Sequence, residues 1–315
     1  MVIFSTVLLL LLLLPTSASA WGAGFHLQLG TSILGNLQAL PAAVATVLGE
    51  FPLDFLYGCI AADITIGKKF THYLQHCHRW PIGLKILANA ASRPQEACAL
   101  GYLSHLAADT IAHNYFVPYK IMLSFPALAM KHTYWEMRFD STVDREIWEI
   151  GRRVSVGRYK ENDVLLRKVL SDTIFSFSTN KRIFNSILLL SRMEKWQDVI
   201  STVSASSRYV LEERDRQEYC SLSREAVFDF LNHREKSRYF LADPTGERAL
   251  ATAEAVRKNF RILYKSGKIT QNEAYRQIEE LKPKLRHAIC APALLQHIHP
   301  TNRDRRPYPF SFSRF

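Results

Sequence analysis

Apolar residues recur along most of the chain with the i, i+3, i+4 spacing of one helix face. The clearest predicted helices span residues 160–176, 180–203, 222–239, 247–264 and 269–285. No stretch alternates apolar and polar residues for long enough to predict a β-strand. The pattern therefore predicts an all-α fold class, with the helices packed into a multi-helix bundle.

Turn and capping signals separate the last two of these predicted helices. Residues 243–246, Asp-Pro-Thr-Gly, should break the chain just before the helix at 247–264. Thr270 and Glu273 have the spacing of a capping box and should begin the following helix. The final stretch, 299–315, has three prolines and no periodicity, so we expect an extended basic tail there.

The first twenty residues have the pattern of a signal peptide. Residues 2–14 are almost wholly apolar, Pro15 follows them, and residues 18–20 (Ala-Ser-Ala) form a small-residue cleavage site. The alternative is an uncleaved membrane anchor, but this apolar run is short for a span that needs about 20 residues. We therefore expect a signal peptide at 1–20, cleavage before Trp21, and export to the periplasm or out of the cell.

The rest of the chain shows no linker, no internal repeat and no later apolar stretch long enough to cross a membrane. We predict one all-α domain over 21–298, with a metal-binding half at 21–157 and a helical second half at 158–298. The five cysteines are irregularly spaced and form no CxxC motif. Most are therefore expected to be buried as small apolar residues rather than to form a disulfide framework, although one pair stays open.

Candidate metal ligands are concentrated in the first half, where seven of the eleven histidines fall between positions 26 and 132. The segment 101–116, GYLSHLAADTIAHNYF, places His105, Asp109 and His113 at i, i+4 and i+8 on one helical stripe. Because its other residues are mostly apolar, this helix should be buried, where ionisable groups are costly unless they are paired or bind a metal. A metal site and a satisfied polar network are the two interpretations.

Further candidates flank this helix. In chain order they are Trp21, His26, Asp63, His72, His76, His78, His132 and Glu136. His132 and Glu136 are spaced i, i+4, a pattern that an ordinary surface pair also has. After signal cleavage, the free α-amine and the first carbonyl of Trp21 could chelate a metal. Cys77 lies between two histidines, but the other candidates are nitrogen and oxygen donors, so we do not expect a thiolate ligand.

The order of these residues resembles the zinc-dependent phospholipase C family. That order is a tryptophan at the mature N-terminus, His, Asp, His, H-x-x-x-D, His and H-x-x-x-E, and it runs over residues 21–136. Single-strand-specific zinc nucleases are related to this family and share its all-helical fold and its cluster of three zinc ions. Each motif alone is weak, but the complete series in this order is specific.

The resemblance implies a ligand set for up to three zinc ions, with Asp109 bridging two of them. The first ion would be held by Asp63, His76 or His78, His105 and Asp109. The second would be held by His113, His132 and Glu136. The third would be held by the amine and carbonyl of Trp21, His26 and the second oxygen of Asp109.

Two details of this ligand set need comment. His78 suits the first site better than His76, because it stands just before Trp80 and an apolar helix, but both stay candidates. The gap from Asp109 to His113 is four residues, shorter than is usual in the family. This gap keeps His113 on the same helical stripe and puts the geometry of the second zinc site in question.

The expected chemistry is hydrolysis of a phosphodiester. Zinc ions can neutralise the charge of the substrate and lower the pKa of a bound water toward about 7. The resemblance implies that Asp63 acts as a base or orients this water. The resemblance thus implies that the chain is a zinc-dependent phosphoric diester hydrolase. The sequence contains neither a Walker loop nor a Rossmann fingerprint.

Three functions are compatible with these residues. The first is a phospholipase C that cleaves glycerophospholipids, because FLYGCIAADI (55–64) and GYLSHLAADTIAHNYF look like the bacterial branch of the family. The second is a single-strand-specific zinc nuclease or nucleotidase with nucleic acid as its substrate, which the short Trp21–His26 spacing favours. The third is a non-catalytic helical protein that holds structural zinc, which a closed, fully liganded site would favour.

The net charge of +11 suits an anionic partner, and its distribution is uneven. Residues 21–157 carry 11 Lys and Arg against 10 Asp and Glu, whereas residues 158–315 carry 29 against 19. The positive charge of the predicted site would therefore come from metal. The basic second half is a candidate face for an anionic membrane surface, and a solvated basic surface without a partner is the alternative.

Overall fold

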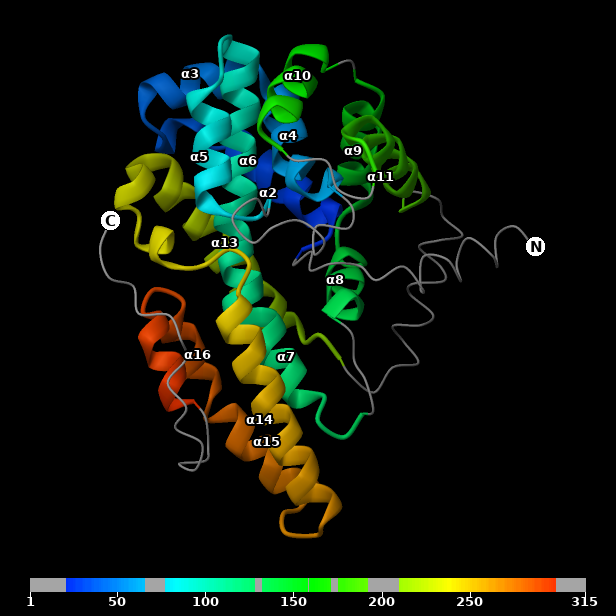
Figure 1. Cartoon of the computed structure of the whole chain (residues 1–315), viewed down its shortest axis with the longest axis vertical. Coiled ribbons are helices and arrows are strands. Elements are labelled where there is room, and N and C mark those ends of the chain that lie inside the picture. Colours follow the sequence, from blue (N-terminus) through cyan, green and yellow to red (C-terminus); the bar gives the residue numbers. More distant parts are fainter. Residues whose placement is uncertain are drawn as a thin grey trace, which may run out of the picture.

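The computed structural model describes residues 21–65, 77–127, 132–157, 159–170, 175–191 and 210–298. Every regular element in these ranges is helical, which confirms the predicted all-α fold class (Figure 1). The α-helices are α2 (Ala23–Leu34), α3 (Ala42–Glu50), α4 (Pro52–Ala61), α5 (Trp80–Ala88), α6 (Arg93–Ile111), α7 (Val117–Leu123), α8 (His132–Asp140), α9 (Arg145–Val156), α10 (Lys160–Val169), α11 (Phe177–Ser191), α13 (Glu213–His233), α14 (Glu247–Lys265), α15 (Gln271–Glu279) and α16 (Lys282–Ala288). Shorter helical segments include η2 (Ala62–Ile64) and the π-helical η5 (Ala112–Phe116).

Helix α6 forms the centre of the fold, and α2, α4, α5 and α13 pack around it (Figure 1). Every residue from Ala97 to Ile111 is buried. This part of α6 carries small or apolar side chains on all sides, and a helix without a polar face is stable only when other helices surround it. The predicted ligands His105 and Asp109 are therefore held in the protein interior.

Two glycines allow α4 and α6 to approach closely. A Cβ atom at Gly101 would collide with the carbonyl oxygen of Phe55, and one at Gly58 would collide with the carbonyl oxygen of Cys98. Both obstacles are backbone atoms, so a change of side-chain rotamer could not relieve them. This close contact places turn η2, which follows α4 directly, against the middle of α6.

The second half of the chain includes an elongated extension. Helices α14 and α15 meet in a hairpin at one end of the molecule, opposite α3 and α10 (Figure 1). A hydrogen bond holds this extension to the body: the hydroxyl of Tyr119, on α7, donates to Glu279 of α15 at 3.0 Å. Ion pairs join the neighbouring helices: Nζ of Lys120, also on α7, donates to Asp215 of α13 at 2.6 Å. Nζ of Lys282, at the start of α16, donates to the other oxygen of Asp215 at 2.7 Å.

The predicted start of the helix at 247–264 is confirmed. Helix α14 begins at Glu247, after Gly246, whose φ of +59° is in the left-handed region that favours glycine. In the same turn, the carboxylate of Asp243 accepts hydrogen bonds from the backbone N–H and the hydroxyl of Thr245. The capping box at the start of α15 is also present.

The predicted helix at 269–285 is wrong as a single element, because it is two helices. Helix α15 ends at Glu279 and α16 begins at Lys282. Pro283 explains the break: it has no N–H to donate, and its ring would clash with the carbonyl of Glu279 in a continuous helix.

The other helix boundaries also differ from the prediction. The helix predicted at 222–239 extends from Glu213 to His233. Its first turns are largely polar, which hides the apolar period, and it ends where Arg234 takes a positive φ of 56°. The helix predicted at 160–176 ends at Val169, where Leu170 becomes extended. The helix predicted at 180–203 begins earlier, at Phe177, and residues 192–209 lie outside the described ranges.

The predicted signal peptide, 1–20, and the predicted tail, 299–315, also lie outside the described residues. Among the helices that are described, none alone has the length and apolar composition of a membrane span. The pair 42–50 and 52–64 meets that test only jointly, with a bend of 95° between its halves. No disulfide joins the five cysteines, all of which are described.

Candidate metal centre

Four side chains from three segments converge beside the middle of α6, and we call them the central cluster. Asp63 comes from turn η2, His78 from the segment leading into α5, and His105 and Asp109 from α6. Nε2 of His78 lies 3.2 Å from Oδ1 of Asp63 and 3.4 Å from Oδ2 of Asp109. Nε2 of His105 lies 3.1 Å from Nε2 of His78 and 3.2 Å from Oδ2 of Asp109.

The spacings around His78 and His105 suit ligands of one zinc ion, and His78, His105 and Asp109 form a group of three possible metal donors. Zinc binds histidine nitrogen and carboxylate oxygen at about 2.0–2.2 Å, so neighbouring corners of the tetrahedron are about 3.3 Å apart. The four separations above, from 3.1 to 3.4 Å, agree with that edge. Neither oxygen of the fully buried Asp109 carboxylate accepts a well-aligned hydrogen bond from the described residues. Because such a carboxylate is costly without a partner, these residues fit a metal ion.

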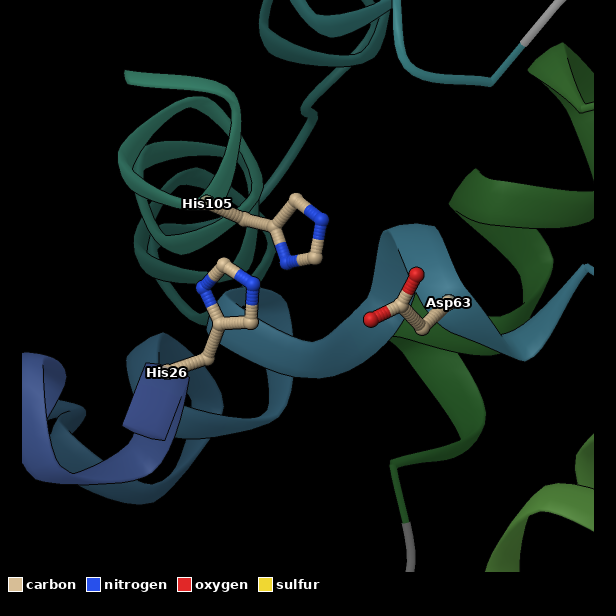
Figure 2. Close-up of side chains that lie close together, drawn as sticks. All are labelled: His26, Asp63 and His105. Carbon is tan, nitrogen blue, oxygen red and sulfur yellow. The ribbon is translucent and has the colours of Figure 1, made fainter. Parts of the chain in front are cut away.

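The second oxygen of Asp109 faces another histidine. Oδ1 of Asp109 lies 3.3 Å from Nε2 of His26, which comes from α2. The ring of His26 stacks on His105, with the two centroids 3.8 Å apart. Figure 2 shows the stacked imidazoles with the carboxylate of Asp63 facing them, and these three residues could themselves hold an ion. The carboxylate of Asp109 is therefore placed as the predicted bridge requires, and its binding of two ions stays a prediction.

Contacts outside the central cluster orient both imidazoles. Nδ1 of His105 lies 2.9 Å from the carbonyl oxygen of Cys59, to which it donates. Nδ1 of His78 lies 3.2 Å from Sγ of Cys77. A histidine that uses Nδ1 in this way presents the lone pair of Nε2 to a metal. Cys77 therefore contacts His78 at the nitrogen that faces away from the central cluster, and its exclusion as a ligand stays a prediction.

Charge interactions within the centre oppose the cost of burial. Burial alone would raise the pKa of Asp109, but His105 and His26 outweigh it and hold this pKa well below its usual range. Burial would lower the pKa of His105, yet Asp109 and Asp63 raise it. For His26, burial and the neighbouring His105 together lower the pKa. An ionised Asp109 and a neutral His26 are the forms that bind a metal.

Trp21 is buried in an aromatic cluster at the start of α2. Its ring stacks on Phe116 with centroids 4.8 Å apart and packs against Phe25 and Phe139. Its Nε1 donates to the carbonyl oxygen of Ala108 at 3.1 Å. These contacts hold Trp21 beside the residue that precedes Asp109 in α6. Chelation of zinc by its α-amine stays a prediction that depends on signal cleavage.

Asp140, at the end of α8, holds the same segment and was missed in the sequence. Its carboxylate accepts hydrogen bonds from the backbone N–H groups of Gly24 at 3.1 Å and Phe25 at 3.0 Å, in the first turn of α2. A Cβ atom at Gly22 would collide with this carboxylate. Burial raises the pKa of Asp140 to about 7 in spite of the two hydrogen bonds. Its spacing of four residues from Glu136 was the only signal, and that spacing does not point to α2.

The second predicted zinc site is not assembled among the side chains that the structure describes. Helix α6 ends at Ile111 and residues 112–116 form a π-helix, so the regular stripe predicted to carry His113 does not continue. His113 is buried, and its Nδ1 lies 2.5 Å from the carbonyl oxygen of Pro244. Glu136 is also buried. Neither joins a group of three metal donors within the described part of the chain.

Two predicted ligands fall where no side chain is described. His76 lies in 66–76, outside the described residues, and the structure places His78 in the central cluster. His132 is the first residue of α8, but its side chain also lies outside what the structure describes. The choice of His78 fits the observed geometry, and the second zinc site stays a prediction.

Comparison with known proteins bears on the same region. The sequence model of the zinc dependent phospholipase C family matches residues 25–177. Residues 25–177 of the chain are therefore similar to the zinc-dependent phospholipase C family. No curated protein and no solved structure matches it. The matched region contains every predicted ligand except Trp21.

The central cluster has the chemistry that a zinc-dependent phospholipase C requires. Its two imidazoles and two carboxylates are donors that zinc binds in hydrolytic sites. Asp63 is the most accessible of the four, with 7% of its side chain exposed against 0% for Asp109 and 1% for His78. The cluster is therefore nearly closed to solvent, and Asp63 is the member with the most exposed side chain.

The turn at Gly246, which contacts His113, leads to a first prediction. Gly246 has a φ of +59°, and a Cβ there would collide with the carbonyl oxygen of His113, whereas Gly267 has a φ of +69° and open space around it. We expect Gly246→Ala to lower the free energy of unfolding by about 2–4 kcal/mol, through backbone strain and overpacking. Gly267→Ala should cost only about 1 kcal/mol, from strain alone. Urea denaturation measures both losses, and equal values would contradict the close packing at His113.

Proposed function

We propose that this protein is a phospholipase C that hydrolyses the phosphodiester bond of glycerophospholipids, releasing diacylglycerol and a phosphorylated headgroup. The observation that carries the proposal is the central cluster. The spacings around its two histidines, His78 and His105, suit zinc ligands, and the cluster lies inside the region that matches the family. The family and the metal chemistry support the same reaction class.

The residues of the central cluster would have two roles, which are to bind the metal ion and to position the attacking water. Zinc bound there would supply positive charge for the phosphodiester and would lower the pKa of water toward about 7. The buried His78, His105 and Asp109 fix the position of the ion. Asp63, on the accessible side, would bind the ion through one carboxylate oxygen and would use the other to orient the attacking water and accept its proton.

The packing of the aromatic residues favours lipid over nucleic acid. Trp21, Trp80, Tyr115, Phe116 and Trp135 are all buried, with at most 6% of any of them exposed. A protein that binds single strands uses exposed aromatic faces on which bases stack, and these rings instead form the core. These five rings therefore offer no stacking surface for the nuclease hypothesis, which the short Trp21–His26 spacing still favours.

We further propose that the chain is exported and cleaved before Trp21, to act in the periplasm or outside the cell. The support is the apolar segment and the Ala-Ser-Ala site in residues 1–20. An exported phospholipase C would meet its glycerophospholipid substrate in membranes.

The processed protein should be assayed on dispersed short-chain phosphatidylcholine and on single-stranded DNA, each with zinc and with a chelator. We expect release of the phosphorylated headgroup, its loss with chelator, and its recovery when zinc is restored. Hydrolysis of DNA alone would contradict the lipid substrate and support the nuclease. Absence of chelator-sensitive hydrolysis of either substrate would leave a structural role for zinc.

A further inference from the structure

We propose that the hairpin between α14 and α15 is a docking surface for an anionic lipid bilayer. We call residues 257–270 the basic hairpin. It contains five Lys and Arg residues and no Asp or Glu. It forms one end of the molecule (Figure 1), where a flat surface can approach without meeting the rest of the protein.

Exposed apolar side chains stand at the end of α14. Ile262 is 56% exposed, Leu263 38% and Tyr264 37%. The ring of Tyr264 lies edge-on to Phe125, with centroids 5.7 Å apart, so the base of the basic hairpin packs on the body. The aliphatic side chains of Ile262 and Leu263, which precede Tyr264 in α14, face solvent, which is costly for a surface that never meets an apolar phase.

Three exposed lysines flank these apolar side chains. They are Lys258, Lys265 and Lys268, and none forms an ion pair within the described residues. The two arginines of the basic hairpin instead donate to the carbonyl oxygen of Ala127 and hold its base. The lysines are thus available to an outside partner, and the arginines are structural.

The basic hairpin itself contains no carboxylate, and its acidic neighbours are engaged locally. Glu273, the next acidic residue along the chain, is held in the capping box of α15, where its carboxylate accepts from the backbone N–H and the hydroxyl of Thr270. On the other side, Glu254 pairs with an arginine of the hairpin base. The local field at the tip is therefore positive.

This combination suits a lipid interface better than other anionic partners. Lysine side chains extend to headgroup phosphates while neighbouring aliphatic groups enter the boundary between headgroups and acyl chains. Each lysine near an anionic bilayer strengthens binding about fivefold. A nucleic acid would respond to the lysines but would leave Ile262 and Leu263 unused.

The basic hairpin is separate from the metal centre. Helix α14 has 19 residues, begins next to the turn that contacts His113, and ends at Lys265. The helix rises about 15 Å from Glu247 to Arg257, where the hairpin begins, and about 28 Å over its whole length to Lys265. Membrane docking can therefore be removed by substitutions in the hairpin that leave the proposed catalytic residues unchanged. The inference does not depend on which phosphodiester is cleaved.

The test is sedimentation of the purified processed protein with phosphatidylcholine vesicles, with and without phosphatidylglycerol. The wild-type protein should bind the anionic vesicles, and added salt should weaken this binding. Lys265→Glu with Lys268→Glu should reduce the binding at least about twentyfold. The matched control, Lys85→Glu with Lys284→Glu, makes the same charge change at exposed positions on α5 and α16 and should bind like wild type.

Two results would overturn the proposal. One is an equal change of vesicle binding in the hairpin variant and the control. Equal loss would mean that binding follows net charge alone, and equal retention would mean that the hairpin lysines take no part in it. The other is preferential binding of single-stranded DNA in competition with anionic vesicles, lost only in the hairpin variant, which would make the hairpin a nucleic-acid surface. Hydrolysis of dispersed short-chain lipid is measured separately, so vesicle binding without hydrolysis supports the docking surface and counts against the proposed activity.

Discussion

Asp109→Asn is expected to lower both zinc affinity and phospholipid hydrolysis by more than about a hundredfold, since loss of a supporting residue alone costs 10- to 100-fold. Asp109 is fully buried, and its two oxygens face different histidines, His105 and His26. Asparagine has the same shape, but it carries no charge and offers only one oxygen. Zinc content by elemental analysis and hydrolysis of short-chain phosphatidylcholine measure the two effects.

Asp163→Asn is the matched control for this change. Asp163 lies on α10, where it accepts hydrogen bonds from the hydroxyl of Tyr57 at 2.6 Å and from Nζ of Lys181 at 2.7 Å. Its replacement should lower the free energy of unfolding by about 1–3 kcal/mol through loss of charged hydrogen bonds, while zinc content stays at the wild-type level. Wild-type zinc content in Asp109→Asn would contradict the proposed bridging role.

Gly101→Ala is expected to lower the free energy of unfolding by more than about 3 kcal/mol, although alanine is the better helix former by up to about 1 kcal/mol. The added Cβ would collide with the carbonyl oxygen of Phe55, so α4 and α6 would have to separate. Asp63 follows α4, and its partner histidine in α6 is His105. Separation of the two helices would therefore also disturb the 3.1–3.4 Å spacings of the central cluster and weaken zinc binding.

Gly49→Ala is the control for helix propensity. Gly49 lies in α3, and a Cβ there would make an ordinary contact with the end of the Leu37 side chain at 3.4 Å. This substitution should leave stability unchanged or raise it by up to about 1 kcal/mol. Thermal and urea denaturation compare the two variants, with zinc titration of any folded Gly101→Ala protein. Similar stability of the two variants would contradict the close packing of α4 on α6.

Local patterns along the chain were enough to predict the type of fold and several of its elements. The start of α14 after Gly246 and the capping box of Thr270 and Glu273 depend on neighbouring residues, and both were predicted. The break before Pro283 was also visible in the sequence, but the apolar period continued through it and masked the two separate helices. The π-helical segment at 112–116 has no such local signal, since the same residues suit an α-helix.

In the candidate site, too, local patterns predict the residue types but not the contacts between distant residues. The order of histidines and aspartates predicted which residue types should meet, and Asp63, His78, His105 and Asp109 do lie together. The contacts that orient them join distant positions, such as the carbonyl of Cys59 with the ring of His105. Those contacts depend on helix packing, as does the bond from the Asp140 carboxylate to the start of α2, and a pattern within one helix does not contain them.

The central claim is that Asp63, His78, His105 and Asp109 together bind zinc. The most direct measurement is an anomalous difference map from crystals of the zinc-loaded protein, with data collected on both sides of the zinc absorption edge. We expect a peak that appears only above the edge, about 2.0–2.2 Å from the donor atoms of all four residues. Bound zinc elsewhere in the crystal, with no peak among these four side chains, would contradict the claim.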